Sequence, residues 1–139
     1  MKVLFDTNII LDVLLDREPF SEHAVYLMSL VERSEINGFL GATTVTTLHY
    51  LLSKYLDRRK SKESITALMA LFEVASVNRL VIENALNSKF TDFEDSVLHE
   101  SARHAGAECI ITRNIKDFKS STIPIYTPIE FLSMLESLG

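Results

Sequence analysis

The side chains most suited to chemistry are carboxylates, an amide and a hydroxyl in three short groups, each next to the expected end of a strand or start of a helix. Carboxylates that gather in one place repel one another unless a cation neutralises them. Mg²⁺ and Mn²⁺ prefer such oxygen ligands, and a site of this kind can activate water and stabilise the transition state of phosphodiester cleavage. The three groups are Asp6; Asp92 with Asp95; and Thr112, Asn114 and Asp117.

The same acids also have purely structural interpretations. Asp6 stands before an expected helix and could simply cap it, and Asp92 could be a first-turn residue favoured by the helix dipole. For these two residues the sequence leaves both interpretations open. Asp95 lies in helical register with Leu98 and Ala102, so we expect it to face inward, where a functional role is the better interpretation.

The composition indicates one globular domain over residues 1–139, with 47% hydrophobic and 24% charged residues. No apolar run approaches the roughly 20 residues that span a bilayer, and we see no basic-then-apolar leader. The single cysteine, Cys109, fits a buried position and a reducing cytoplasm. The net charge of −5 argues against a broad nucleic-acid-binding surface, but a local basic patch beside an acidic metal site is compatible with it.

Apolar segments with strand character alternate with segments of helical periodicity. This alternation predicts an α/β fold of three layers, with a central parallel sheet covered by helices on both faces. If the first and fourth strands are neighbours, their carboxyl ends lie roughly 5 Å apart, and Asp6 and Asn114 flank one crevice. The predicted strands are 2–5, 39–42, 74–77, 108–112 and 123–126; the predicted helices are 8–15, 21–31, 43–56, 61–72, 79–87, 93–104 and 127–135.

Three motifs together resemble those of a PIN domain, and their order and separation hold over nearly the whole chain. The resemblance implies a strand order of 3-2-1-4-5 and a nuclease in which clustered acids bind Mg²⁺ or Mn²⁺ and cleave RNA. For a small chain it also implies a VapC-like toxin that a cognate antitoxin inhibits and that frequently forms a homodimer. The motifs are Asp6-Thr7-Asn8, Asp92-Phe93-Glu94-Asp95, and Thr112-Arg113-Asn114 with Asp117-Phe118.

The resemblance also implies roles for individual residues. Metal ligands are expected from the acids and from the amide that follows the fourth strand, and neighbouring polar side chains are expected to orient them through hydrogen bonds. The expected ligands are Asp6, Asp95 and Asn114, with Asp92 as an additional candidate, Asp117 as a ligand or supporting acid, and Thr112 and Asn8 as the orienting residues.

One position departs from the PIN pattern. Such domains usually carry a Glu in the third helix, and here His49 occupies that position. His49 lies in register with Val45 and Leu52, so we expect it to face inward. A core histidine, a neutral metal ligand and a proton carrier are all open interpretations. Loss of one acid could weaken Mg²⁺ binding, favour Mn²⁺ or reduce the activity.

A nuclease must also hold phosphate groups, so cations near the expected site are of interest. Arg113 and Lys116 lie beside the third motif and are the favoured RNA contacts. A denser basic run over residues 54–62 is interpreted as a solvated helix end. Tyr50 and Tyr55 are interpreted as members of a core stripe rather than a base-stacking platform.

Two other functions compete with metal-dependent RNA cleavage by the toxin of a toxin–antitoxin pair. The first is a PIN-like module that binds RNA or protein without cleaving, and His49 keeps this alternative open. The second is an aspartate-phosphorylating phosphatase or a receiver-like domain. It is disfavoured, because it requires an Asp two residues after the nucleophile or a Lys after a later strand, and the residue two positions after Asp6 is Asn8.

Overall fold

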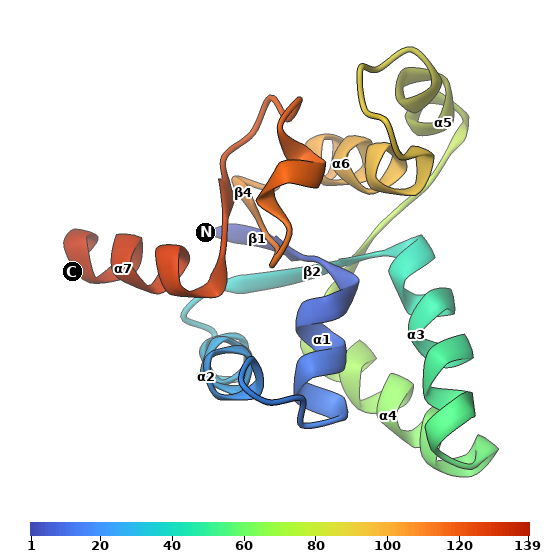
Figure 1. Ribbon diagram of the computed structural model, residues 1–139, viewed down its shortest axis with the longest axis vertical. Helices are drawn as coiled ribbons and strands as arrows, with labels where there is room; N and C mark the ends of the chain where they lie inside the picture. The colour runs from blue at the N-terminus through green and yellow to red at the C-terminus, as the bar shows by residue number, and fades with distance from the viewer.

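A computed structural model describes all 139 residues and shows a parallel sheet between two layers of helices (Figure 1). The strands are β1 (Lys2–Phe5), β2 (Asn37–Gly41), β3 (Glu73–Ala75), β4 (Cys109–Ile111) and β5 (Ile125–Tyr126). They lie in the order β3-β2-β1-β4-β5, and every neighbouring pair is parallel. The predicted three-layer fold and its strand order are therefore confirmed.

The helices alternate with the strands, as the sequence predicts. They are α1 (Thr7–Leu14), α2 (Ser21–Glu32), α3 (Ala42–Tyr55), α4 (Arg58–Leu71), α5 (Arg79–Leu86), α6 (Phe93–Ala105), α7 (Pro128–Leu138) and the 3₁₀ helix η1 (Ile115–Phe118). One face of the sheet is covered by α1 to α4 and α7, the other by α6 and η1, and α5 packs on α6. None of these helices has both the length and the apolar character that crossing a membrane requires.

Strand β1 separates two hydrophobic clusters, because successive side chains of a strand point to opposite faces. Val3 and Phe5 belong to the large cluster beneath α1, and Leu4 belongs to the smaller cluster beneath α6. All three are fully buried, which explains why the strand reads as a continuous apolar run. Cys109 is buried in the large cluster, as predicted, and burial raises the pKa of its thiol to about 12.

Two acids fix where the helices around the sheet edge begin. Asp6 caps α1 by accepting a hydrogen bond from the amide of Thr7, and Asp92 caps α6 by accepting one from the amide of Asp95. Gly106 ends α6 in the left-handed conformation, with φ of 78°. Asp6 thus caps its helix, as its structural interpretation expected, whereas Asp92 is the cap of α6 and not a first-turn residue. Capping also places both carboxylates at the start of helices that leave the same edge of the sheet.

Most element boundaries differ from the prediction by one to three residues, and two of these differences have a clear cause. Strand β2 begins at Asn37, because Gly38 continues the strand with its backbone against the ring of Phe72, where a Cβ atom would lie 2.6 Å from a ring carbon. Helix α4 also begins earlier than predicted. Its cap is Asp57, whose carboxylate accepts a hydrogen bond from the amide of Lys60.

The interpretation of Tyr50 and Tyr55 as core residues is wrong. Their exposed fractions are 63% and 70%. The buried stripe of α3 consists of Thr44, Leu48 and Leu52, and Tyr50 points away from it. These two rings are therefore available at the surface.

Candidate metal and phosphodiester site

The site begins where β1 and β4 end, because these neighbouring strands are parallel and their carboxyl ends meet at one edge of the sheet. The amide of Asp6 donates to the carbonyl of Ile111 at 2.9 Å, which continues the ladder past β1. The hydroxyl of Thr112 donates to Oδ2 of Asp6 at 2.7 Å and accepts from the amide of Asn114 at 3.0 Å. Thr112 therefore holds the first acid and the loop after β4 together.

Asp6 forms no ion pair, and the charges that act on its pKa are those of other acids. Burial raises the pKa of its carboxyl, and hydrogen bonds from Thr112 and Thr7 offset part of this rise. The negative charges of Asp117 and Glu94 raise the pKa further. Acids from η1 and from the start of α6 thus stand close enough to Asp6 to oppose its ionisation.

Asp95 experiences the same repulsion more clearly. Burial raises the pKa of its carboxyl to about 7, and four nearby acids contribute to the rise. Asp95 is half-buried and forms no ion pair. The four acids, in decreasing order of their effect, are Asp92, Asp6, Asp117 and Glu94. We refer to these four residues and Asp95 as the acid cluster.

The acid cluster offers the donors that a hard divalent cation prefers, because its ligating atoms are all oxygens. A bound cation would also relieve the repulsion that raises the pKa of Asp6 and Asp95. As the side chains stand, no three His, Cys, Asp or Glu residues are close enough to hold one ion together. Mg²⁺ usually retains several waters and binds through one or two carboxylates, so these residues fit it.

The predicted site residues differ in their exposure and in their partners. Asn114, Asp117 and Asp92 are exposed, whereas Asp6 and Asp95 are partly buried. Asn8 has a different partner: its Oδ1 accepts a hydrogen bond from Nη2 of Arg17 at 3.2 Å. Asn8 is therefore linked to an arginine rather than to the acids it was expected to orient.

The prediction that His49 faces inward is wrong. It is exposed and lies roughly 100° around α3 from Leu48, the centre of the buried stripe. Its side chain forms no hydrogen bond or ion pair, so it is not a core histidine. Helix α3 approaches the site through Thr44, whose hydroxyl lies 3.0 Å from that of Thr7. Near the acids, α3 thus contributes a hydroxyl and no carboxylate.

Arg113, a predicted RNA contact, forms an ion pair with the buried carboxylate of Asp12. Its Nε lies 3.0 Å from Oδ2 of Asp12, although the angle is too poor for a hydrogen bond, and its Nη2 donates to Oδ1 at 3.4 Å. Nε of Arg17 donates to the same Oδ1 at 2.9 Å. The Arg113 guanidinium also stacks 3.9 Å from the ring centroid of Phe20. We call these four residues the arginine clamp.

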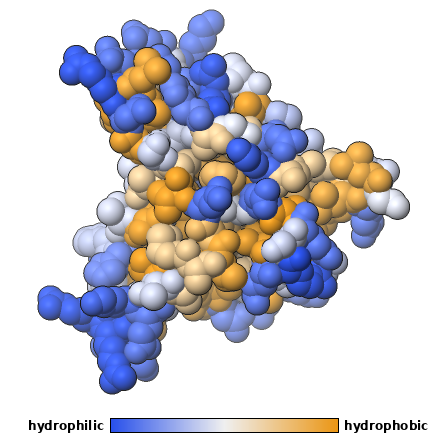
Figure 2. All heavy atoms as spheres, turned by 180° about the vertical axis from the view of Figure 1, so that it is seen from behind, coloured by the Kyte–Doolittle hydropathy of each residue, from blue (hydrophilic) through white to orange (hydrophobic).

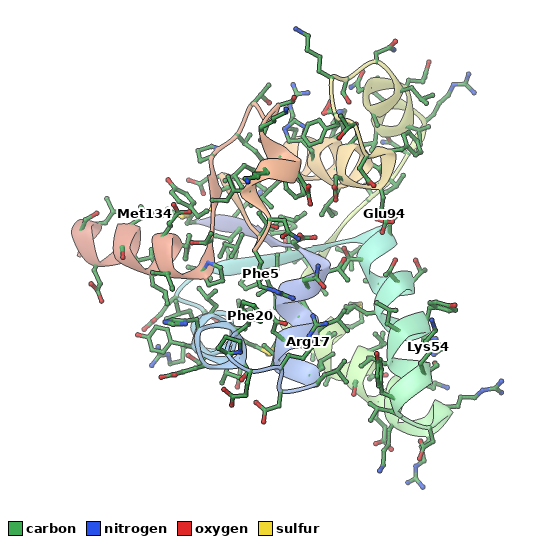
Figure 3. All side chains as sticks on the ribbon, viewed as in Figure 1. Phe5, Arg17, Phe20, Lys54, Glu94 and Met134 are labelled. Atoms are coloured by element: carbon green, nitrogen blue, oxygen red, sulfur yellow. The ribbon has the colours of Figure 1, made fainter.

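The arginine clamp ties together segments that are far apart in the sequence. Phe20 and Arg17 lie near each other beside α1, and Arg113 reaches them from the loop after β4 (Figure 3). This arrangement argues against Arg113 as a free phosphate contact. Lys116 is exposed and unpaired, so it is the better candidate for that role.

Two acids whose charged neighbours are well defined in the structure, Glu94 and Asp12, were not among the predicted site residues. Glu94 belongs to the acid cluster and lies in the first turn of α6 (Figure 3). Its place between Asp92 and Asp95 was a usable signal, but the helical-register argument selected only Asp95. Asp12 is fully buried, and a lone acid among apolar residues of a short helix was the signal for its arginine partners.

Comparison with known proteins identifies the family to which the chain belongs. The profile of the PIN-domain family matches residues 2–116. The chain therefore belongs to the PIN-domain family. No curated protein matches it in sequence.

Several solved structures share the fold. VapBC2 from Rickettsia felis, bound to a DNA fragment from its promoter, gives a TM-score of 0.71 at 13% identity, covering 90% of this chain and 97% of that one. A toxin–antitoxin complex from Klebsiella pneumoniae gives 0.67 at 23% identity, covering 91% and 97%. VapBC-1 from nontypeable Haemophilus influenzae gives 0.68 at 17% identity, covering 93% and 99%. At these identities the similarity establishes the fold alone.

Proposed function

We propose that the chain is a metal-dependent endoribonuclease that hydrolyses RNA phosphodiester bonds at the acid cluster. The observation that carries this proposal is the convergence of five acids from three elements at one sheet edge, with no cation paired to them. Acids with raised pKa values at such an edge are characteristic of functional sites. PIN domains are generally nucleases, so membership of the family supports hydrolysis as the reaction class.

The chain's own residues would hold and orient the reacting groups. Thr112 donates a hydrogen bond to Oδ2 of Asp6 and so holds that carboxylate in one orientation at the end of β1. Mg²⁺ or Mn²⁺ bound there would supply an activated water and neutralise the charge that develops on the phosphate. Lys116 is the proposed phosphate contact. The proposed metal ligands are Asp6, Asp95, Asn114 and Asp92, with Asp117 as a supporting acid.

We further propose that this nuclease is the toxin of a toxin–antitoxin pair and acts as one domain in the cytoplasm. The fold it shares with toxin–antitoxin complexes from R. felis and K. pneumoniae supports this role. A cognate antitoxin is then a protein partner, and a homodimer is the expected assembly. Exposed apolar side chains on the projecting helix α7, among them Ile129 and Leu138, favour protein contact at that end of the molecule (Figure 2).

The test is cleavage of a mixed pool of single-stranded and structured RNAs by purified protein, free of any antitoxin. The reactions contain Mg²⁺, Mn²⁺ or EDTA, and Asp6→Asn and Asp95→Asn are assayed in parallel. We expect cleavage with a divalent metal, none with EDTA, and none from either variant. Binding of Mn²⁺, measured by calorimetry, gives a second readout and should weaken in both variants.

A binding module without cleavage is the second candidate. It is favoured by the absence of a carboxylate from α3, because His49 occupies the position where PIN domains usually carry Glu. Folded protein that binds RNA but cleaves nothing with either metal would support this candidate and overturn the nuclease. His49→Glu would then show whether the missing acid is the cause.

A further inference from the structure

The end of α3 and the start of α4 form a hairpin that projects from the sheet, and its charge is opposite to that of the rest of the chain (Figure 1). We call residues 50–63 the basic arm. It contains five Lys and Arg residues against two acids, a net +3, whereas the whole chain carries −5 and the remainder therefore carries −8. The tip is among the most hydrophilic parts of the surface in Figure 2, at the lower left. Its cations are Lys54, Arg58, Arg59, Lys60 and Lys62.

Most of these cations have no anionic partner within the chain. Arg59 pairs with Glu63 at 3.1 Å, but Arg58, Lys60 and Lys62 form no ion pair. All are exposed. A solvated helix end normally mixes both signs of charge, whereas this one concentrates a single sign on a molecule that is otherwise acidic.

Two exposed aromatic rings stand among these cations. Tyr50 and Tyr55 are 63% and 70% exposed, and Nζ of Lys54 lies 4.5 Å from the ring centroid of Tyr50. An exposed aromatic face next to a cation is the arrangement on which bases of single-stranded nucleic acid stack while phosphates pair with the charges. This combination distinguishes the arm from an ordinary polar hairpin.

Helix α3 connects the arm to the acid cluster. Its first turn carries Thr44, which contacts Thr7 beside Asp6. A rise of 1.5 Å per residue places Tyr50 roughly 12 Å and Lys54 roughly 18 Å along the helix from its start. A strand held in the site therefore needs only a few more nucleotides to reach the arm.

We infer that the basic arm binds the segment of single-stranded RNA that flanks the cleavage position, with Tyr50 stacking on a base and the free cations contacting phosphates. This inference rests on the proposed function for the identity of the ligand as RNA. The acid cluster repels phosphate in the absence of metal, so the arm supplies the attraction that the site lacks.

The experiment measures RNA binding separately from cleavage. Asp6→Asn protein is titrated against a fluorescent single-stranded RNA of about 12 nucleotides, with EDTA, over about 50 to 200 mM salt. In the first variant Arg58, Lys60 and Lys62 become Gln. Because each lost phosphate contact lowers the salt slope by about 0.7, the slope should fall by about 2 and the affinity at least tenfold. The matched control converts three exposed cations elsewhere, Arg79, Lys89 and Lys119, to Gln.

The second variant tests stacking. Tyr50→Ala should weaken binding between about 5-fold and 100-fold with little change in the salt slope. Tyr26→Ala is its control, because Tyr26 is similarly exposed, at 53%, on a different helix. Equal binding by the arm variants and their controls would overturn the inference even if the wild-type protein cleaves RNA.

Cleavage by the wild-type protein gives the complementary result. Arm variants should raise KM for the longer RNA and leave a trinucleotide unaffected, since a trinucleotide does not reach the arm. If no RNA is cleaved but the arm variants still lose binding, the inference stands and the proposed nuclease fails. If the arm variants bind RNA normally but lose affinity for an acidic protein partner, the arm is a protein-docking surface and the inference is wrong.

Discussion

Asp6 is the cap of α1 and Asp12 lies inside the same helix. The charges next to these two carboxylates have opposite signs. Asp12 is fully buried and lies between the guanidinium groups of Arg17 and Arg113. Asp6 accepts hydrogen bonds from neutral groups, and the nearest charges that act on its pKa are those of other acids. Burial alone therefore does not separate the two residues, whereas the sign of the neighbouring charges does.

This difference in neighbouring charge distinguishes a structural ion-pair network, the arginine clamp, from the candidate functional site, the acid cluster. The arginine clamp balances its acid inside the chain, which makes the region rigid but leaves little charge for a ligand. The acid cluster leaves its charge unbalanced, which costs stability and is the property on which the proposed cation site rests. Arg113 connects the two regions, because it follows Thr112 directly in the sequence and Thr112 holds Asp6.

The largest expected effect is on activity at the unbalanced acid. Asp6→Asn should lower the rate of RNA cleavage at least about 1,000-fold, because the site loses a charged ligand. Its melting temperature in EDTA should not fall, since Asn caps a helix as well as Asp and the repulsion is removed. Asp57→Asn is the matched control, because Asp57 caps α4 away from the cluster, and it should retain cleavage. An Asp6→Asn enzyme with more than a tenth of the wild-type rate would contradict the assignment.

The second effect is on stability at the balanced acid. The double variant Arg17→Gln/Arg113→Gln should lose about 3–5 kcal/mol of unfolding free energy, because it leaves the Asp12 carboxylate buried without a counter-charge. Adding Asp12→Asn should recover a large part of this loss. Urea denaturation measures all three proteins. A triple variant no more stable than the double variant would show that the carboxylate is not the source.

Surface arginines provide the control for the clamp. Arg33 and Arg79 also pair with acids, Glu35 and Glu83, but at exposed positions. Exposed pairs contribute roughly 0–1 kcal/mol, so Arg33→Gln/Arg79→Gln should change the unfolding free energy far less than the clamp variant does.

The third effect concerns the acid that the sequence interpretation passed over. Glu94→Gln should reduce cleavage about tenfold at limiting Mg²⁺ and much less at saturating Mg²⁺, because it weakens cation binding without removing a principal ligand. Glu22→Gln is its control, since Glu22 is also an exposed first-turn acid, on α2. The same loss at every Mg²⁺ concentration would place Glu94 in the chemical step rather than in metal affinity.

The smallest effect is a pH-dependent gain in stability. The pKa of Asp95 is about 7 in the folded protein, above the roughly 3.9 of an unfolded carboxyl. The folded state therefore keeps a proton that the unfolded state releases, and stability falls as the pH rises through this interval. Asp95→Asn removes the effect. In EDTA at pH 8 it should stabilise by about 1 kcal/mol, or about 3 °C, after allowance for solvent screening of a half-exposed group.

Thermal melting from pH 4 to pH 8 checks this prediction. The difference between Asp95→Asn and the wild type should shrink towards pH 4, where the folded carboxyl is almost fully protonated and the unfolded one is about half protonated. A difference that does not change with pH would show that the substitution acts through packing or capping instead.

Local sequence patterns predicted the fold well, because the hydrophobic periodicity and the capping residues that mark each strand and helix lie within a few positions of one another. The apolar run of β1 and the capping residue Thr127 before α7 are examples, and the latter forms the full capping box with Glu130. Pattern was less informative about which side of α3 is buried. His49 and Tyr50 share helical spacing with apolar residues, yet the neighbouring helices cover only the stripe through Leu48.

By itself the sequence determined the α/β alternation and the positions of Asp6, Asp92 and Asp95 at element ends, because short-range periodicity and capping are local properties. The tertiary structure decided which acids lack a counter-charge. Arg113 lies 101 positions from Asp12, and Thr112 lies 106 positions from Asp6. No local pattern encodes those partners. Parallel pairing of β1 with β4 brings them together. That pairing adds the second counter-charge of Asp12, whereas it gives Asp6 only a neutral hydrogen-bond donor.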